Sequence, residues 1–137
     1  DIVHCSGRIS HLVPLYLKRA FKNDPIFSDA KVVLSLYDEY MDCGFNADMK
    51  VKIPVSGIKS KDLDSFKAPD GINLAKLAIQ YADAVILGAE NIRQELIEFA
   101  QNRKIPILPY FPIEHPDGTY IQTYNEFYDK LLEQDAK

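Results

Sequence analysis

The chain has 137 residues, of which 47% are apolar and 26% are charged, and one globular domain with one core is expected at this size. Its formal net charge is −4, which disfavours a nucleic-acid partner, because such partners are usually bound by a basic surface. Its apolar runs are far shorter than the roughly 20 residues that cross a bilayer, so no membrane partner is expected.

Four short apolar runs, rich in β-branched residues, predict buried strands. They cover residues 1–5, 31–37, 83–87 and 105–108. The first run places Asp1 inside a strand, with neither an initiator Met nor a signal peptide before it. We therefore expect the chain to be a fragment whose preceding residues are missing.

Helical spacing of apolar residues separates these runs. It predicts helices over Ile9–Phe21, Asn91–Asn102 and Thr123–Glu133, and a further helix capped by Asn73. Ser6 or Ser10 can cap the first helix, and Pro14 falls in or near its first turn, where its missing N–H costs least. The expected buried positions on the later helices are Leu74, Leu77, Ala78, Tyr81, Ile92, Leu96, Ile97, Ala100, Phe127, Leu131 and Leu132.

Residues 40–70 give the weakest pattern. Ser60–Phe66 predicts one short capped helix, whereas Met49–Ile58 fits either a strand or a helix.

Strands that alternate with helices predict a parallel sheet, which is an α/β, Rossmann-like fold with flanking helices and right-handed crossovers. Ligands of such sheets bind beyond the carboxyl ends of the strands. The loops at those ends are Ser6-Gly7-Arg8, Tyr37-Asp38-Glu39 and Gly88-Ala89-Glu90. We therefore predict that Ser6, Gly7, Arg8, Tyr37, Asp38 and Gly88 face a ligand.

Two of these loops carry groups with possible chemistry. Ser6-Gly7-Arg8 stands between a strand and a helix, where backbone N–H groups and an Arg side chain can bind phosphate, although a plain turn with a solvated Arg is the commoner outcome without a glycine-rich motif. Asp38 and Glu39 offer paired carboxylates for acid–base work, or a simple solvated turn.

Histidines and cysteines show no metal-site spacing, so neither a metal nor a cofactor is expected. His4 in a strand predicts a packed, hydrogen-bonded ring. His11 is expected to be solvated near the start of the first helix, and His115 to be exposed in a proline-rich loop. Cys5 and Cys43 suggest reduced thiols in the cytoplasm.

Several segments resemble the bacterial glycogen/starch synthases, which are glycosyltransferases of the GT-B fold. Asp1 to Leu17 is similar to the pattern D-V-V-H-x-H-D-W-H-T-x-L-x-P-x-Y-L of their N-terminal lobe, through Asp1-Ile2-Val3-His4 and Leu12-Val13-Pro14-Leu15-Tyr16-Leu17. Residues 31–38 are similar to the family pattern K-x-V-x-T-V-H-N, and residues 73–85 are similar to the pattern N-x-x-K-x-x-I-x-x-A-D-x-V. Residues 88–96 resemble the turn and helix that follow that pattern, and residues 125–131 resemble the end of a compact bacterial branch of the family.

The resemblance implies that residues 1–137 form a single domain, the C-terminal part of such a lobe. It implies a parent activity of glucosyl transfer from ADP-glucose to an α-1,4-glucan, in a cleft between two lobes and without a metal. The family motif H-D-W-H is replaced by Ser6-Gly7-Arg8-Ile9, so the histidine implicated in holding the donor glucose becomes Ile9. The family's K-x-G-G-L loop is not in the chain, and neither is the second, nucleotide-gripping lobe. We therefore expect the chain alone to be inactive.

Two further interpretations compete with this one. The first is a degenerate, non-catalytic relative that binds glucan or protein, which the loss of H-D-W-H favours. The second is a free-standing flavodoxin-like module, against which stand the missing acidic cluster and the missing flavin-phosphate loop. In any partial lobe the strand over residues 1–5 would lie at an exposed sheet edge, which predicts self-association or packing of another chain there.

Overall fold

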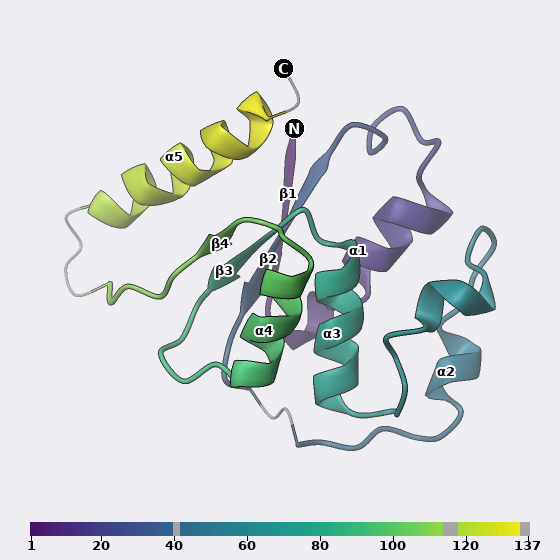
Figure 1. Cartoon of the computed structure of the whole chain (residues 1–137). Coiled ribbons are helices and arrows are strands. Elements are labelled where there is room, and N and C mark those ends of the chain that lie inside the picture. The colour runs from purple at the N-terminus through teal and green to yellow at the C-terminus, as the bar shows by residue number, and fades with distance from the viewer. Residues whose placement is uncertain (40–41, 114–117, 135–137) are drawn as a thin grey trace.

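The computed structural model describes residues 1–39, 42–113 and 118–134. All four predicted strands are present and form one parallel sheet (Figure 1), which confirms the α/β, Rossmann-like prediction. The sheet order follows the chain order: β1 (Ile2–Ser6), β2 (Lys31–Leu36), β3 (Ala84–Leu87) and β4 (Ile107–Leu108). β1 therefore lies at an edge, and in register Cys5 stands beside Leu34 and Ser6 beside Ser35.

The central strand β2 shows why the sheet is covered on both faces. Its side chains alternate, as strand geometry requires. Val32, Leu34 and Leu36 enter an apolar cluster with residues of α3 and α4, while Val33 enters a second cluster with residues of α5. A strand that is buried on both faces needs a continuous apolar run, which is what the sequence contains.

The first helix is shorter and less regular than predicted. A 3₁₀ turn, η1 (Arg8–Ser10), comes first, then α1 (Val13–Leu15), which continues as a π-helical segment, η2 (Tyr16–Ala20). Pro14 lies in the first turn of α1, as expected. The expected capping by Ser6 or Ser10 is wrong: Ser10 Oγ donates to the carbonyl of Gly7, and neither helix start has a side-chain cap.

Residues 42–81 contain two short elements and one long helix. Met49–Lys52 is a helix, α2, which decides the alternative left open by the sequence, and the predicted helix over residues 60–66 is a 3₁₀ turn, η3 (Ser60–Leu63). The helix α3 (Gly71–Tyr81) starts earlier than expected, because Asp70 rather than Asn73 is its cap. The extended backbone of Asp70 lets its carboxylate accept the N–H of Asn73 at 2.8 Å.

The last two helices keep their predicted ends but not their starts. α4 (Gln94–Asn102) begins after Arg93, whose backbone is not helical. α5 (Thr119–Glu133) begins four residues before the predicted start at Thr123. The sequence missed this first turn because the turn is largely solvated and shows no apolar spacing. Leu131 is buried, but Leu132 is 39% exposed, so its assignment to the core was wrong.

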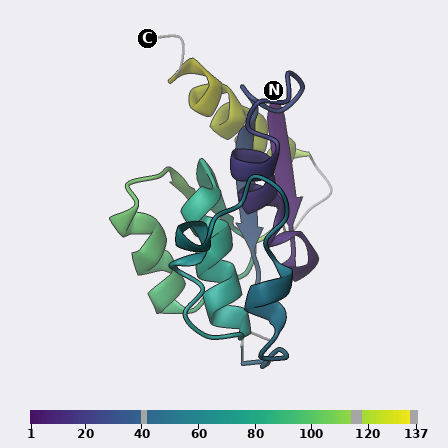
Figure 2. The ribbon, with the colours of Figure 1, turned by 90° about the vertical axis from the view of Figure 1, so that its right-hand side faces the viewer.

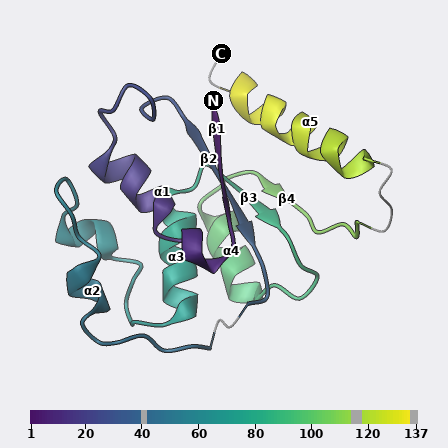
Figure 3. The same ribbon diagram turned by 180° about the vertical axis from the view of Figure 1, so that it is seen from behind.

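The helices cover the two faces unequally. α3 and α4 lie side by side against one face of the sheet (Figure 2), and α1 packs on α3. α5 is set apart from those helices (Figures 1 and 3) and packs through Leu131, Tyr124, Phe127 and Tyr128 on the side chains that point the other way. None of the helices in the described parts of the chain is both long enough and apolar enough to cross a bilayer.

Candidate functional site

The three predicted loops meet at the carboxyl ends of β1, β2 and β3. Tyr37 stands at their centre: its hydroxyl lies 3.3 Å from Ser6 Oγ, and its ring lies against the backbone of Gly88. A Cβ on Gly88 would lie 2.5 Å from Tyr37 Cε1, so any larger residue at this position would force the ring of Tyr37 to move. An ion pair between Arg93 and Asp42 further joins the segment after β3 to the segment after β2.

The loop after β1 already holds a carboxylate of the chain itself. Gly7 adopts φ 75°, a left-handed conformation suited to glycine, and the Arg8 N–H that follows donates to Glu39 Oε2 at 3.3 Å. Arg8 Nη1 lies 3.2 Å from Cys43 Sγ. A phosphate bound at this N–H would therefore have to replace the carboxylate of Glu39. Asp38, beside it, is exposed to solvent.

His11 is buried, which corrects the expectation that it is solvated. Only 1% of its surface is exposed, and burial lowers the pKa of its ring to about 4, against a smaller opposing effect of the Glu39 carboxylate. No described residue pairs with its Nδ1. The imidazole is therefore neutral at physiological pH, and its burial left no local signal because the 3₁₀ turn before α1 breaks the helical spacing.

His4 forms the hydrogen bonds that the sequence led us to expect, but the residue is exposed at the sheet edge and not packed inside the core. Its Nε2 lies 2.6 Å from Ser35 Oγ, and its Nδ1 lies 2.7 Å from the hydroxyl of Tyr128 on α5. Partial burial lowers the pKa of His4, which favours the neutral ring. His4 thus joins the edge strand to α5, while His115 lies outside the described residues.

An aromatic hollow that the sequence did not predict opens beside Gly88. Its volume is about 260 Å³, and its lining consists of Leu87, Gly88, Tyr110, Phe111, Ile113 and Tyr124. Phe111 and Tyr124 meet edge to face with ring centroids 5.9 Å apart, and burial raises the pKa of the Tyr124 hydroxyl. The pair Tyr110-Phe111 directly after the fourth strand was the available signal.

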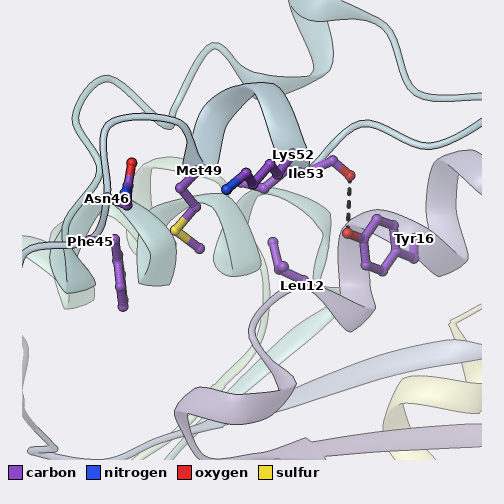
Figure 4. Close-up of a pocket in the computed structure, with 7 residues that line it drawn as sticks. All are labelled: Leu12, Tyr16, Phe45, Asn46, Met49, Lys52 and Ile53. Atoms are coloured by element: carbon purple, nitrogen blue, oxygen red, sulfur yellow. Dashed lines mark hydrogen bonds between the residues drawn. The ribbon is translucent and has the colours of Figure 1, made fainter.

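A second, more apolar hollow lies between α1 and α2 (Figure 4). Its volume is about 320 Å³, and Leu12, Tyr16, Phe45, Asn46, Met49, Lys52 and Ile53 line it. The Tyr16 hydroxyl donates to the carbonyl of Ile53 at 3.0 Å and so joins the two helices. None of these residues belongs to the three loops at the sheet edge.

The sheet edge places polar groups beside an aromatic wall. Hydroxyls of Ser6 and Tyr37 and the guanidinium of Arg8 supply hydrogen bonds, and the aromatic hollow supplies flat apolar faces. Within residues 1–39, 42–113 and 118–134 there is no group of three or more His, Cys, Asp or Glu side chains that could hold a metal ion.

Comparison with known proteins shows the family of the chain. The sequence model of the family described as the starch synthase catalytic domain matches residues 1–105, which is most of the chain. The chain belongs to this family. The resemblance is therefore confirmed at family level: the first three strands, the Pro14 turn and α3 all fall inside the matched range.

Curated relatives agree with the family. A glycogen synthase of Photobacterium profundum is 27% identical over 71% of this chain, and one of Clostridium perfringens is 24% identical over 70%. Glycogen synthase 2 of Geobacter metallireducens is 28% identical over 74%. The matched parts make up 19–21% of those proteins, so the chain spans about a fifth of their length. No solved structure matches the chain.

Within the range of the family match, Ser6 and Ile9 are exposed to solvent, and Gly7 and Arg8 between them are half-buried. Ile9, which the sequence resemblance aligns with a family histidine, is 100% exposed on the 3₁₀ turn η1. Its side chain makes no packing contribution to the core, so core packing does not explain why an isoleucine stands there.

Proposed function

We propose that residues 1–137 are the C-terminal part of the N-terminal lobe of a glycogen- or starch-synthase-like glycosyltransferase. The parent activity would be glucosyl transfer from ADP-glucose to an α-1,4-glucan. The observation that carries this proposal is the meeting of Ser6, Tyr37 and Gly88 at the carboxyl edge of a parallel sheet, in a chain that matches the starch synthase catalytic domain.

The residues of the sheet edge fit the parts of a nucleotide sugar. Ser6 and Tyr37 hydroxyls suit sugar hydroxyls, and Arg8 suits a phosphate once Glu39 has moved away from its backbone N–H. Gly7 carries no side chain that would block the Arg8 N–H, Gly88 lets the ring of Tyr37 lie against the backbone of the edge, and Asp38 is exposed beside them. These six positions, with Tyr124 in the aromatic wall, form the proposed sugar-facing edge.

The chain alone should not turn over substrate. Ile9 can neither donate nor accept a hydrogen bond where the family histidine holds the donor glucose. The matched region is also only about a fifth of the curated relatives. The resemblance to GT-B glycosyltransferases implies that catalysis would need a cleft between two lobes. Glucose incorporation into glycogen from ADP-glucose should therefore equal a no-protein blank.

A chimera tests the proposal. Residues 1–105 replace the matched segment of the Clostridium perfringens glycogen synthase, once as they stand and once with Ser6→His, Gly7→Asp, Arg8→Trp and Ile9→His. We expect the first chimera to fold without glucosyl transfer and the second to regain it. Activity of the first chimera would refute the role given to the lost histidine, and a folded but inactive second chimera would refute the equivalence of the two segments.

A degenerate binding module is the second candidate function. It is favoured by the Glu39 carboxylate, which occupies the Arg8 N–H where a donor phosphate would bind, and by the loss of the motif side chains. Saturable binding of a maltooligosaccharide by a chimera that stays inactive even with the restored motif would support this candidate over the enzyme.

The edge strand β1 supports a proposal about partners. β1 pairs with β2, and no other strand in the described residues pairs with its outer side, so its outer backbone groups are open to another chain. We expect self-association through this edge. Light scattering at two concentrations tests it, and a mass that stays at 15.6 kDa up to millimolar concentration would contradict it. The proposed location is the cytoplasm, where the free thiols of Cys5 and Cys43 would stay reduced.

A further inference from the structure

Two polar hollows lie at the opposite end of the molecule, away from the proposed sugar-facing edge. The larger, of about 290 Å³, is lined by Lys18, Arg19, Gln80, Tyr81, Ala82, Asp83 and Arg103. The smaller, of about 160 Å³, is lined by Arg19, Lys22, Gly57, Lys59, Lys61 and Asp62. Because α3, α4 and the end of α1 all lead toward the amino ends of the strands, these hollows gather at that edge, and Arg19 belongs to both.

The charge of this double hollow is opposite to that of the whole chain. Six cations and two carboxylates line it, in a protein whose formal net charge is −4. The helix dipole favours a cation such as Arg103 just after α4, but it does not account for Lys59 and Lys61, which lie in a loop and a 3₁₀ turn. A basic concavity on an acidic protein concentrates anions.

The two carboxylates are already occupied. Asp83 Oδ2 accepts from Lys18 Nζ at 2.6 Å and from the Val32 N–H at 2.7 Å. Asp62 accepts from Arg19 Nε at 3.0 Å and from the Lys59 N–H at 2.8 Å. These bonds fix Lys18 and Arg19 at the walls of the hollows, so both cations are held in place before any ligand arrives.

Four other cations line the hollows without such a carboxylate. Within the described residues, Lys22, Lys59, Lys61 and Arg103 form no salt bridge, and their side chains are exposed. Three of them, Lys22, Lys59 and Lys61, line the smaller hollow together with Arg19, and Arg103 lines the larger. The positive charge of the site is therefore not neutralised by the chain itself.

Two independent features mark the walls of the larger hollow. Lys18 and Arg19 lie in the π-helical segment η2, where the Phe21 N–H donates to the carbonyl of Tyr16 five residues earlier, and such segments are frequent at functional sites. Gln80 Oε1 is buried without a donor among the described residues, although its Nε2 reaches the Tyr81 hydroxyl. A buried carbonyl oxygen without a donor is costly, and a ligand hydroxyl would satisfy it.

We propose that this double hollow binds a small phosphate monoester that also carries hydroxyl groups. The phosphate would bind between Arg19, Arg103 and the neighbouring lysines, since guanidinium groups match phosphate oxygens with two parallel hydrogen bonds. A hydroxyl would donate to Gln80 Oε1. A volume of 290 Å³ is that of roughly ten water molecules, which suits a small ligand rather than a polymer.

The test is a titration of the chain with glycerol 3-phosphate, inorganic phosphate and glycerol, followed by calorimetry and by amide chemical shifts. We expect glycerol 3-phosphate to bind more tightly than inorganic phosphate, glycerol not to bind, and the shifts to centre on Arg19, Ala82 and Arg103. No binding of either phosphate at millimolar concentration, or shifts centred on Gly7 and Gly88 instead, would overturn the proposal.

Variants separate this site from general attraction by charge. Lys59→Ala with Arg103→Ala removes one exposed cation from each hollow, and it should weaken both phosphates about tenfold. The matched control, Lys50→Ala with Lys130→Ala, removes two exposed lysines on α2 and α5 and should leave affinity unchanged. Equal weakening by both double variants would overturn the proposal, because it would show that only net charge matters.

Gln80→Met tests the hydroxyl contact by removing the unpaired oxygen from a side chain of similar length. It should weaken glycerol 3-phosphate toward the affinity of inorganic phosphate and leave inorganic phosphate unchanged. Equal loss for both ligands would contradict the assigned role of Gln80, and the unfolding midpoint of each variant shows whether its fold is intact.

Discussion

The two faces of the sheet are held by different kinds of contact. Against α3 and α4 the sheet presents aliphatic side chains that are almost fully buried in one large cluster, with Leu34, Ile79 and Leu96 at its centre. Against α5 the cluster is smaller, and it merges into polar contacts in which His4 bridges Ser35 and Tyr128.

This difference indicates which parts of the molecule are fixed and which can open. The α3–α4 face depends on buried volume, which contributes several kcal/mol for each large side chain. The α5 face depends more on hydroxyl and ring contacts, which contribute about 1 kcal/mol each. We therefore expect α5 to exchange its amide hydrogens before α3 does. Tyr124 of α5 also lines the aromatic hollow, so this hollow would open together with α5.

The largest expected effect is on the aliphatic face. Leu96→Ala removes a side chain with no exposed surface from the middle of that cluster and should lower the free energy of unfolding by about 2–5 kcal/mol. Urea denaturation measures the change. Leu132→Ala on α5 is the matched control and should stay within about 0.5 kcal/mol of the parent chain. If both variants lost the same free energy of unfolding, the stability would not depend on the buried volume between the sheet and α3–α4.

The pH dependence of the free energy of unfolding tests the burial of His11 before the first helix. The pKa of His11 is about 4 in the folded chain and ordinarily 6.5, so the unfolded state binds more protons between these values. The stability is therefore fully present above pH 6.5 and is lost as the pH falls toward 4, by up to about 3 kcal/mol.

His11→Leu removes the titrating ring and keeps an apolar side chain in its place. Most of the loss of stability between pH 6.5 and 4 should disappear in this variant, leaving the smaller effect of His4, whose pKa is also lowered. If the two unfolding curves depend on pH equally, His11 is not neutral and buried.

Gly88→Ala tests the close approach at the boundary between the two faces. The added methyl group would overlap the ring of Tyr37, which should cost about 1–3 kcal/mol in thermal or urea unfolding. In a Tyr37→Ala background the same change should cost much less. A Gly88→Ala penalty that is the same in both backgrounds would show that the ring does not press on this backbone.

The smallest expected effect is on the α5 face. Tyr128→Phe deletes the hydroxyl that lies 2.7 Å from His4 Nδ1 and should cost about 1 kcal/mol, with faster amide exchange confined to α5. Tyr120→Phe is the control, since its ring contacts Tyr124 while the two ring nitrogens of His4 pair with Ser35 and Tyr128. Faster exchange in α3 as well would contradict the independence of α5.

The sequence predicted the sheet well because each strand is a short apolar run between polar turns. Residues 31–37 and 83–87 show this most clearly, as their buried strands match the prediction almost residue for residue. The meeting of the three loops was also predictable, since parallel strands bring their carboxyl ends to one edge.

Other features depend on contacts between distant residues and were not predictable. The burial of His11 follows from how η1 and α1 pack, and the carboxylate at the Arg8 N–H comes from Glu39, 31 residues away. The Asp70 cap was missed for a local reason: Asp and Asn both favour the cap position, and the helix begins at the earlier of the two. The aromatic hollow needs Tyr124 of α5 beside Gly88, which local patterns do not encode.

Nucleotide sugars and glucans are expected to meet the chain at the carboxyl edge of its sheet. The most direct measurement is a ¹H–¹⁵N chemical-shift titration of the 137-residue chain with ADP-glucose and with a maltooligosaccharide. The account predicts the largest shifts at Ser6, Gly7, Tyr37, Gly88 and Tyr124. Shifts confined to the outer surfaces of α3 and α4, or no shift with either ligand, would contradict it.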